Sequence, residues 1–145
     1  MRAWENIKLV NEIDKSIQIE FTKNLEKIVL NSDKEQISRV FFNLIKNSIE
    51  SIQQKAENDS KFNKKITIEL SEIDDHICIV IVDSGIGFSK VSSNIKDILN
   101  PYFTTKKNGT GLGLSIVNKI ISDHNGKIDF VSISGGAKIK IDFIK

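Results

Sequence analysis

The sequence has little cysteine, little proline and little excess charge. Its 145 residues include one cysteine, Cys78, and one proline, Pro101, and the formal net charge is +2. A single cysteine excludes a disulfide framework within the chain and fits a reducing, cytosolic setting. The lysines are spread along the chain rather than clustered, so the composition does not favour a nucleic-acid partner.

Long apolar runs are also missing. No run approaches the roughly 18 residues of a membrane span, and the amino-terminal "MRAWENIKLVNEID" lacks the apolar stretch of a signal peptide. The 39% hydrophobic and 28% charged residues are ordinary for a globular protein. We therefore expect one cytoplasmic domain over residues 1–145, without direct membrane contact, whether or not its parent protein is anchored in the inner membrane.

Apolar periodicity predicts the secondary structure. Helical spacing predicts a short helix over residues 4–14, a long one from a cap at Ser32 or Asp33 to about residue 56, and one from about residue 113 to Gly126. Alternating residues predict strands over 16–21 and 27–30, a hairpin over 64–83, and a hairpin over 127–144 turned by Gly135-Gly136.

The expected fold class is α+β. It is a two-layer α/β sandwich whose mixed, mostly antiparallel sheet packs on about three helices. "ICIVIV" is a continuous apolar run that ends before Asp83, which predicts a strand covered on both faces. Residues 84–109 form a long irregular stretch, and loops of that length are usually either functional lids or disordered.

Two asparagines stand out on the long helix. Asn43 and Asn47 are four residues apart and therefore share a face, at the edge of the apolar stripe. Their carbonyl oxygens suit Mg²⁺ and phosphate-bound water. Taken alone, the pair more often indicates ordinary surface polar residues.

Two glycine-containing motifs follow. In "VDSGIGF", Asp83 comes directly after a buried strand, and Gly85 and Gly87 let the backbone approach a flat ligand; a plain strand-ending turn has the same pattern. In "NPYFTTKKNGTGLGLSI", three alternating glycines precede a helix whose N-terminus favours a polyphosphate. Lys106 and Lys107, just before the glycines, can offset the negative charge of the phosphates. The glycine spacing matches neither a Walker A loop nor the dinucleotide fingerprint, and by itself it also suits a flexible loop.

The motifs together resemble one family. N-x-x-x-N on a helix, D-x-G-x-G after a strand, P-Y-F-T-T-K, and G-T-G-L-G-L before a helix occur in this order in the catalytic ATP-binding domain of two-component sensor histidine kinases. These belong to the wider group of gyrase-type, chaperone and mismatch-repair ATPases with the Bergerat fold. "NLIKNSIESI" and "PYFTTK…GTGLGLSIV" look most like the nitrogen-regulation sensor kinases, and the resemblance covers roughly residues 5–145.

The resemblance implies ATP and Mg²⁺ as ligands. It implies an ATP site formed by Asn43, Asn47, Asp83, Gly85, Gly87, Phe103, Thr104, Thr105, Lys106, Gly109, Thr110, Gly111, Leu112, Gly113 and Leu114. Asn47 matches the metal-holding asparagine, with Asn43 as its catalytic neighbour, and Asp83 matches the aspartate that accepts a hydrogen bond from the adenine amino group. Phe103 and its neighbours match a mobile lid, expected at about residues 89–109, and the glycines serve the phosphates and the hinge of the lid.

One departure from the wider group indicates the reaction. Its hydrolases have a glutamate base four residues before the metal asparagine, where this chain has Asn43, which cannot take a proton at neutral pH. Histidine kinases lack that glutamate too, so the resemblance implies transfer of the γ-phosphoryl to a histidine. The alternatives are a stand-alone serine kinase of the anti-sigma-factor type and a nucleotide-dependent binding module without catalysis.

The expected partners lie outside the chain. Neither His76, beside a strand, nor His124, at a helix end, has the sequence context of an acceptor, so both are expected to face solvent or to pack. The acceptor is therefore expected on a separate histidine-bearing dimerisation domain, and a response regulator is expected to take the phosphoryl group onwards. Cys78 is expected in the core.

Overall fold

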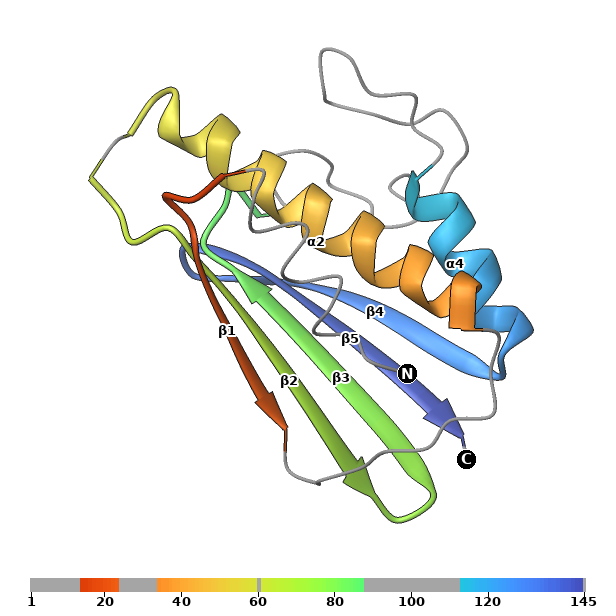
Figure 1. The fold of residues 1–145 in the computed structure, drawn as a ribbon. Coiled ribbons are helices and arrows are strands. Elements are labelled where there is room, and N and C mark those ends of the chain that lie inside the picture. Colours follow the sequence, from red (N-terminus) through yellow and green to blue (C-terminus); the bar gives the residue numbers. More distant parts are fainter. Residues whose placement is uncertain (1–13, 24–33, 60, 88–112, 145) are drawn as a thin grey trace.

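The fold is a two-layer sandwich of one sheet and two helices within the described part of the chain. The computed structural model describes residues 14–23, 34–59, 61–87 and 113–144. Helices α2 (Lys34–Ala56) and α4 (Gly113–Asp123) lie side by side on one face of the sheet (Figure 1). The expected α+β class and two-layer architecture are confirmed; the expected helix over 4–14 and strand over 27–30 lie outside the described residues.

The sheet is mixed and mostly antiparallel, as expected. Its strands are β1 (Gln18–Lys23), β2 (Lys65–Ile73), β3 (His76–Asp83), β4 (Gly126–Ile133) and β5 (Gly136–Ile144). Their order across the sheet is β1-β2-β3-β5-β4. The β1–β2 pair is parallel and the other three pairs are antiparallel. Helix α2 connects the parallel pair, since parallel neighbours need a crossover connection.

The turns of both hairpins contain two residues. Ile73 pairs with His76, so Asp74-Asp75 turns the first hairpin, and Asp74 has a positive φ of 55°. In the second hairpin Ile133 pairs with Gly136, so the turn is Ser134-Gly135. The prediction of a Gly135-Gly136 turn was one residue late, because Gly136 already belongs to β5 and Gly135 alone has the left-handed φ, 79°.

The helices bury apolar stripes against the sheet. The fully buried side chains of α2 recur with helical spacing: Val40, Phe41, Leu44, Ile45, Ile49 and Ile52. Helix α4 contributes Val117, Ile120 and Ile121 to the same core. Each such side chain stabilises the fold by roughly 1.5–3 kcal/mol relative to an exposed position.

Helix α4 ends at Asp123, three residues before the predicted end at Gly126. The left-handed residue after the helix is Asn125, with φ 59°, and Gly126 starts β4. A side chain at Gly126 would lie only 2.8 Å from Ile121 and Phe143, so this glycine is required by close packing and not by a helix cap.

Strand β3 is covered by helices on one face only among the described residues. Ile77, Ile79 and Ile81 belong to the core, whereas Val80 and Val82 on the other face are half-buried. Lys140 and Lys138 of β5 pair with these two valines across the strands, and long lysine stems can shield apolar neighbours. The prediction of cover on both faces was therefore too strong, although Cys78 is buried as expected, with 7% exposure.

No helix in the described ranges is long and apolar enough to span a bilayer.

Candidate functional site

Asp83 is a buried acid at the carboxyl end of β3. Its side chain is 5% exposed, and the backbone N–H of Gly85 donates to its Oδ1 at 2.8 Å. Burial raises the pKa of Asp83, while the Gly85 N–H, the nearby Ser48 hydroxyl and the charge of Lys55 oppose that rise. The carboxyl group therefore depends on a few specific neighbours to stay an ionised acceptor.

Ser48 lies close to this carboxyl group on α2. Its side chain is 2% exposed, and its Oγ makes no hydrogen bond within the described residues, although it is near enough to Asp83 to lower its pKa. An unsatisfied buried hydroxyl costs free energy unless a ligand or water completes its bonding. The helix face beside Asp83 thus retains hydrogen-bonding capacity for a polar ligand.

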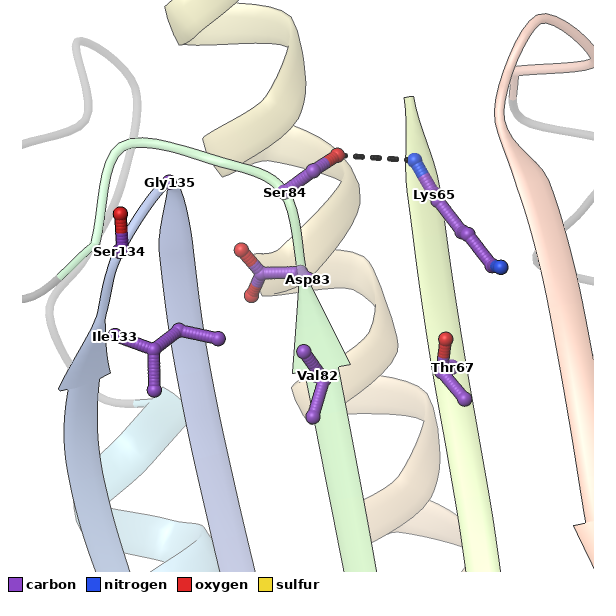
Figure 2. Close-up of a pocket in the computed structure, with 8 residues that line it drawn as sticks. All are labelled: Lys65, Thr67, Val82, Asp83, Ser84, Ile133, Ser134 and Gly135. Carbon is purple, nitrogen blue, oxygen red and sulfur yellow. Dashed lines mark hydrogen bonds between the residues drawn. The ribbon is translucent and has the colours of Figure 1, made fainter. Parts of the chain in front are cut away.

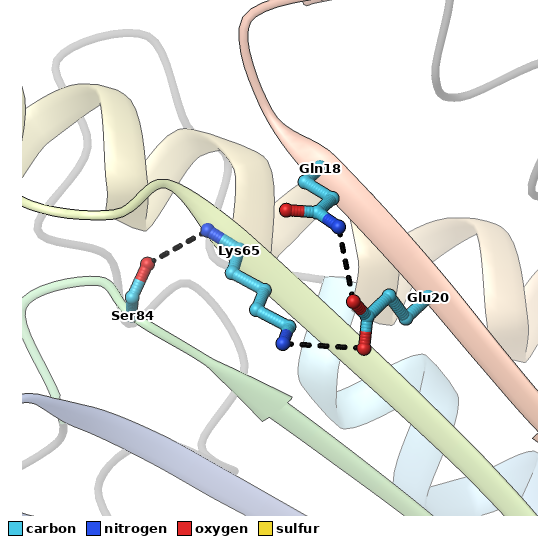
Figure 3. Close-up of polar contacts among 4 residues, drawn as sticks. All are labelled: Gln18, Glu20, Lys65 and Ser84. Atoms are coloured by element: carbon cyan, nitrogen blue, oxygen red, sulfur yellow. Dashed lines mark hydrogen bonds and ion pairs between the residues drawn. The ribbon is translucent and has the colours of Figure 1, made fainter.

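Ser84 joins the end of β3 to the start of β2. Its backbone N–H donates to the Lys65 carbonyl at 3.1 Å, and its Oγ accepts from the Lys65 N–H at 3.0 Å. Figure 3 shows this contact beside the Lys65–Glu20 ion pair, at 3.2 Å, and the Gln18–Glu20 hydrogen bond, at 3.0 Å. The segment that follows Asp83 is therefore anchored to the neighbouring strand.

The two glycines of this segment are required by close contacts. A side chain at Gly85 would overlap Ser51 Oγ on α2 and lie 2.9 Å from Asp83 Oδ1. Gly87 has a left-handed φ of 77°, and a side chain there would lie 2.8 Å from the Gly136 carbonyl oxygen. The Ile86 N–H donates to Ser51 Oγ at 3.0 Å. The strand end thus packs directly against the helix and the β4–β5 turn.

Asn43 and Asn47 lie at the edge of the buried stripe of α2, as the spacing predicted. Both are half-buried, and they flank the fully buried Leu44 and Ser48. Ser51, which holds Ile86, comes four residues after Asn47 on the same ridge of the helix. One helix edge therefore carries both asparagines and the contact to the Asp83 segment.

The second half of the predicted site lies outside the described residues. These positions are Phe103, Thr104, Thr105, Lys106, Gly109, Thr110, Gly111 and Leu112. Gly113 is the first residue of α4, and Leu114 is half-buried against the core, which confirms the predicted helix start. The expected lid over 89–109 also lies outside the described residues and stays a prediction.

A shallow depression of about 190 Å³ opens on the other face of the sheet (Figure 2). Thr67 and Val82 line it together with Ile133, at the end of β4, and the turn residues Ser134 and Gly135. The side chains of Thr67 and Val82 alternate with buried core residues, so the depression faces away from the helices. Asp83 and Ser84 also line it, whereas Asn43 and Asn47, on α2, do not.

The described residues contain no cluster of three or more His, Cys, Asp or Glu side chains that could hold a metal ion. A metal at this site would depend on amide oxygens and on the oxygens of its ligand, as Mg²⁺ bound with substrate phosphates commonly does.

Both histidines have the structural roles expected of them. The His76 side chain is 51% exposed and lies 3.9 Å from Asp142. The Nδ1 atom of His124 lies 2.7 Å from the Ile120 carbonyl oxygen at the end of α4.

Four residues near Asp83 were not predicted from the sequence: Ser48, Ser51, Ser84 and Lys55. Ser51 had a usable signal, because it repeats the four-residue spacing of the two asparagines. Ser48, Ser84 and Lys55 had none, because their partners are distant in the sequence.

Comparisons with known proteins agree with this geometry. Residues 32–145 match the family "Histidine kinase-, DNA gyrase B-, and HSP90-like ATPase". The chain is 36% identical over 122 residues to the sensor histidine kinase ZraS of Salmonella typhi, which covers 83% of this chain and 24% of that protein. It is 34% identical over 137 residues to a putative NtrY-like sensor histidine kinase of Rickettsia felis, covering 94% of this chain and 21% of that protein.

A solved structure supports the same relationship. The nucleotide-free catalytic domain of histidine kinase ThkA superposes with a TM-score of 0.78 at 29% identity, covering 100% of this chain and 93% of that one. The chain spans about a quarter of the length of the curated sensor kinases that it matches. It belongs to the histidine kinase-, DNA gyrase B- and HSP90-like ATPase family, as the ATP-binding catalytic domain of a sensor histidine kinase.

Proposed function

We propose that this domain transfers the γ-phosphoryl group of ATP, bound with Mg²⁺, to a histidine on a separate dimerisation domain, from which a response regulator takes it. The observation that carries the proposal is the buried acceptor Asp83 beside the helix edge of Asn43 and Asn47. Support also comes from the sensor histidine kinases that the chain resembles. We further propose that the domain works in the cytoplasm, where its ATP is available.

The proposed roles follow the chemistry of each side chain. Asp83 accepts a hydrogen bond from the adenine amino group, which selects adenine over guanine, because guanine has a carbonyl oxygen at that position. The glycines at positions 85 and 87 let the segment after Asp83 pack closely against α2 and β5, which keeps the Asp83 carboxyl group in place. The Ser48 hydroxyl, which lies beside Asp83 and makes no hydrogen bond within the described residues, gives the purine end a further polar group.

The metal end of the site is assigned to Asn47, with Asn43 beside it. An amide oxygen of Asn47 would hold Mg²⁺, whose charge would offset that of the triphosphate. Asn43 has no basic group with which to activate water or a serine hydroxyl. This favours an acceptor that is already a nucleophile, such as imidazole, over rapid hydrolysis or serine phosphorylation.

The lid stays part of the proposal. Residues 89–109, with Phe103, Thr104, Thr105, Lys106 and the following glycines, would close over the nucleotide. Hydrogen exchange in that segment should slow when an ATP analogue binds, whereas equal exchange with and without the analogue would remove the lid from the proposal.

The test is phosphoryl transfer to an added histidine-bearing helical hairpin of a related sensor kinase, with γ-labelled ATP. The wild-type domain should give an acid-labile, base-stable product, as phosphohistidine is. Asn47→Ala should abolish the transfer at saturating ATP and Mg²⁺, because it removes a metal ligand. It should weaken ATP binding less when Mg²⁺ is absent, because the adenine contacts remain.

The matched control is Asn58→Ala, the same change at an exposed position after α2. It should transfer at the wild-type rate. An acid-stable product on serine would instead support a serine kinase, and ATP binding without any transfer would support a binding module. Native transfer by Asn47→Ala would show that α2 does not hold the metal.

A further inference from the structure

Lys55 connects four segments of the chain at the purine end of the site. From the last turn of α2, its ammonium group donates to the Ser84 carbonyl at 3.1 Å and to the Gly135 carbonyl at 3.2 Å. It also lies 4.5 Å from the centre of the Phe62 ring, in the chain between α2 and β2. One cation thus binds the helix to the end of β3, the β4–β5 turn and an aromatic side chain.

This arrangement differs from that of an ordinary lysine at a helix end. Such a lysine usually faces solvent and interacts with the last carbonyl groups of its own helix. Here the end of α2 is closed by backbone bonds, since the N–H groups of Asn58 and Asp59 donate to the Lys55 carbonyl. The Lys55 side chain instead reaches carbonyl groups 29 and 80 residues away.

The carbonyl groups that Lys55 binds belong to the two segments that pack around Asp83, the end of β3 and the β4–β5 turn. Ser84 lies between Asp83 and Gly85, and a side chain at Gly136, next to Gly135, would overlap the Asp83 carbonyl oxygen. Ser51 holds Ile86 of the same segment from one turn earlier on α2. Lys55 and Ser51 therefore fix the Asp83 segment to the helix that also carries Asn47.

We propose that Lys55 is a positioning residue for adenine recognition, which holds the end of β3 and the β4–β5 turn against α2 so that the Asp83 carboxyl group stays in place to accept from the adenine amino group. The inference rests on the proposed function, because it assigns Asp83 to the adenine amino group. It adds a residue outside the four sequence motifs to the nucleotide site.

The charges around Asp83 agree with this role. Lys55 is the charged group among the described residues that lowers the pKa of Asp83, and Gly85 and Ser48 oppose the effect of burial as neutral partners. Lys65, on the neighbouring strand β2, is paired with Glu20 instead. Removing the Lys55 charge should therefore raise the pKa of Asp83 further, so that nucleotide binding is lost at a higher pH on acidification.

The experiment compares Lys55→Met, Lys55→Gln and Lys55→Arg with the wild-type domain. Calorimetry measures ADP affinity without metal, which isolates the purine end, across roughly pH 5–8, where a raised carboxyl pKa is detected. Lys55→Met should weaken binding about two- to tenfold near neutral pH, the usual effect of losing a hydrogen bond. Its binding midpoint should also move to higher pH, whereas Lys55→Arg should keep the wild-type midpoint.

Lys119→Met is the matched control. Lys119 is 77% exposed and pairs with Asp123 on the surface of α4, so this variant should bind ADP as the wild type does. Lys55→Gln keeps a donor but removes the charge, and it supplies the test if Lys55→Met does not fold. It should therefore move the midpoint even where its affinity near neutral pH is partly retained.

Lys55 variants that fold and bind ADP with the wild-type affinity and the wild-type pH midpoint would overturn the inference. They would leave the proposed function intact. A loss of affinity that is equal at every pH would also overturn it, because that result indicates a merely structural role. Failure of the wild-type domain to bind either ADP or ATP would instead overturn the proposed function, and this inference with it.

Discussion

At the scale of single residues, burial raises the pKa of Asp83, and three neighbours oppose that rise. A buried carboxylate loses hydration, which raises its pKa. The Gly85 N–H, Ser48 and Lys55 lower the pKa by less than burial raises it. The folded chain therefore holds a proton on Asp83 more tightly than the unfolded chain does. Between the ordinary value of 3.8 and the raised pKa, this residue makes the free energy of unfolding fall as pH rises.

Asp83→Asn should therefore stabilise the nucleotide-free domain near neutral pH while weakening ATP binding. The amide oxygen can still accept from Gly85, but the side chain no longer brings a charge into the core. The loss of affinity should be about 1–3 kcal/mol, because the amide can present a donor to the adenine amino group. Denaturant unfolding across roughly pH 5–8 checks the stability, and calorimetry checks the affinity.

The pH dependence provides the control for this variant. The wild-type domain should lose stability relative to Asp83→Asn as pH rises from 3.8 to the raised pKa, and the two should converge in stability below 3.8. A variant that is less stable than the wild type at neutral pH would contradict the view that the charge is costly to the fold.

Residue positions that depend on local sequence could be predicted, and contacts between distant partners could not. Asn43, Asn47 and Asp83 follow from spacing within one helix and at one strand end. Lys55 could not be found in this way, because its acceptors on Ser84 and Gly135 come together only in the folded sheet.

At the scale of elements, the β4–β5 hairpin supports the Asp83 segment through Gly136, the first residue of β5. The sequence located the hairpin correctly, yet it could not tell which glycine turns the chain and which packs. Gly135 has a left-handed φ and open space around it, whereas Gly136 lies against the backbone of Asp83 and Ser84. That distinction depends on the neighbour β3, which no local pattern specifies.

Gly136→Ala should destabilise the domain, because its methyl group would overlap the Asp83 carbonyl oxygen and lie 3.1 Å from Ser84 Cα. Backbone atoms in a sheet cannot move away cheaply, so we expect a loss of about 1–3 kcal/mol in the free energy of unfolding. ATP affinity should also fall, since the overlap displaces the strand end that carries Asp83. Urea unfolding and calorimetry measure the two effects.

The control is Gly135→Asn in the same turn. A side chain at Gly135 meets no atom within 4 Å, and asparagine tolerates the left-handed φ, so the cost should be about 1 kcal/mol or less. The Gly135 carbonyl remains available to Lys55. Equal stability of Gly136→Ala and the wild type would disprove the close packing of this turn on β3.

At the scale of the whole molecule, the sheet order places Asp83, the proposed adenine acceptor, at the end of a central strand. The fold class and most elements follow from periodicity, but the order β1-β2-β3-β5-β4 and the parallel β1–β2 pair are set by long-range packing. The apolar run of β3 indicated two covered faces, because periodicity cannot separate a helix layer from shielding by neighbouring lysines. Asp83 thus ends a central strand, and α2 and α4 cover one face of the sheet (Figure 1).

This central position predicts that nucleotide binding stabilises the whole domain and depends on adenine. ATP with Mg²⁺ at about 100 times its Kd should add about 2.7 kcal/mol to the free energy of unfolding. For a domain of this size, that corresponds to a rise of roughly 5–10 °C in Tm. GTP at the same concentration should give a much smaller rise, because its carbonyl group faces the Asp83 carboxylate.

Two variants separate the ends of the site in the same melting experiment. Asp83→Asn should start from a higher Tm and lose most of the rise with ATP, whereas Asn47→Ala should lose mainly the part that depends on Mg²⁺. If GTP raised the Tm of the wild-type domain as much as ATP does, Asp83 would not select the base. If Asn47→Ala kept the full rise with Mg²⁺, the metal would be held elsewhere, because a ligand stabilises the fold only through groups that bind it in the folded state.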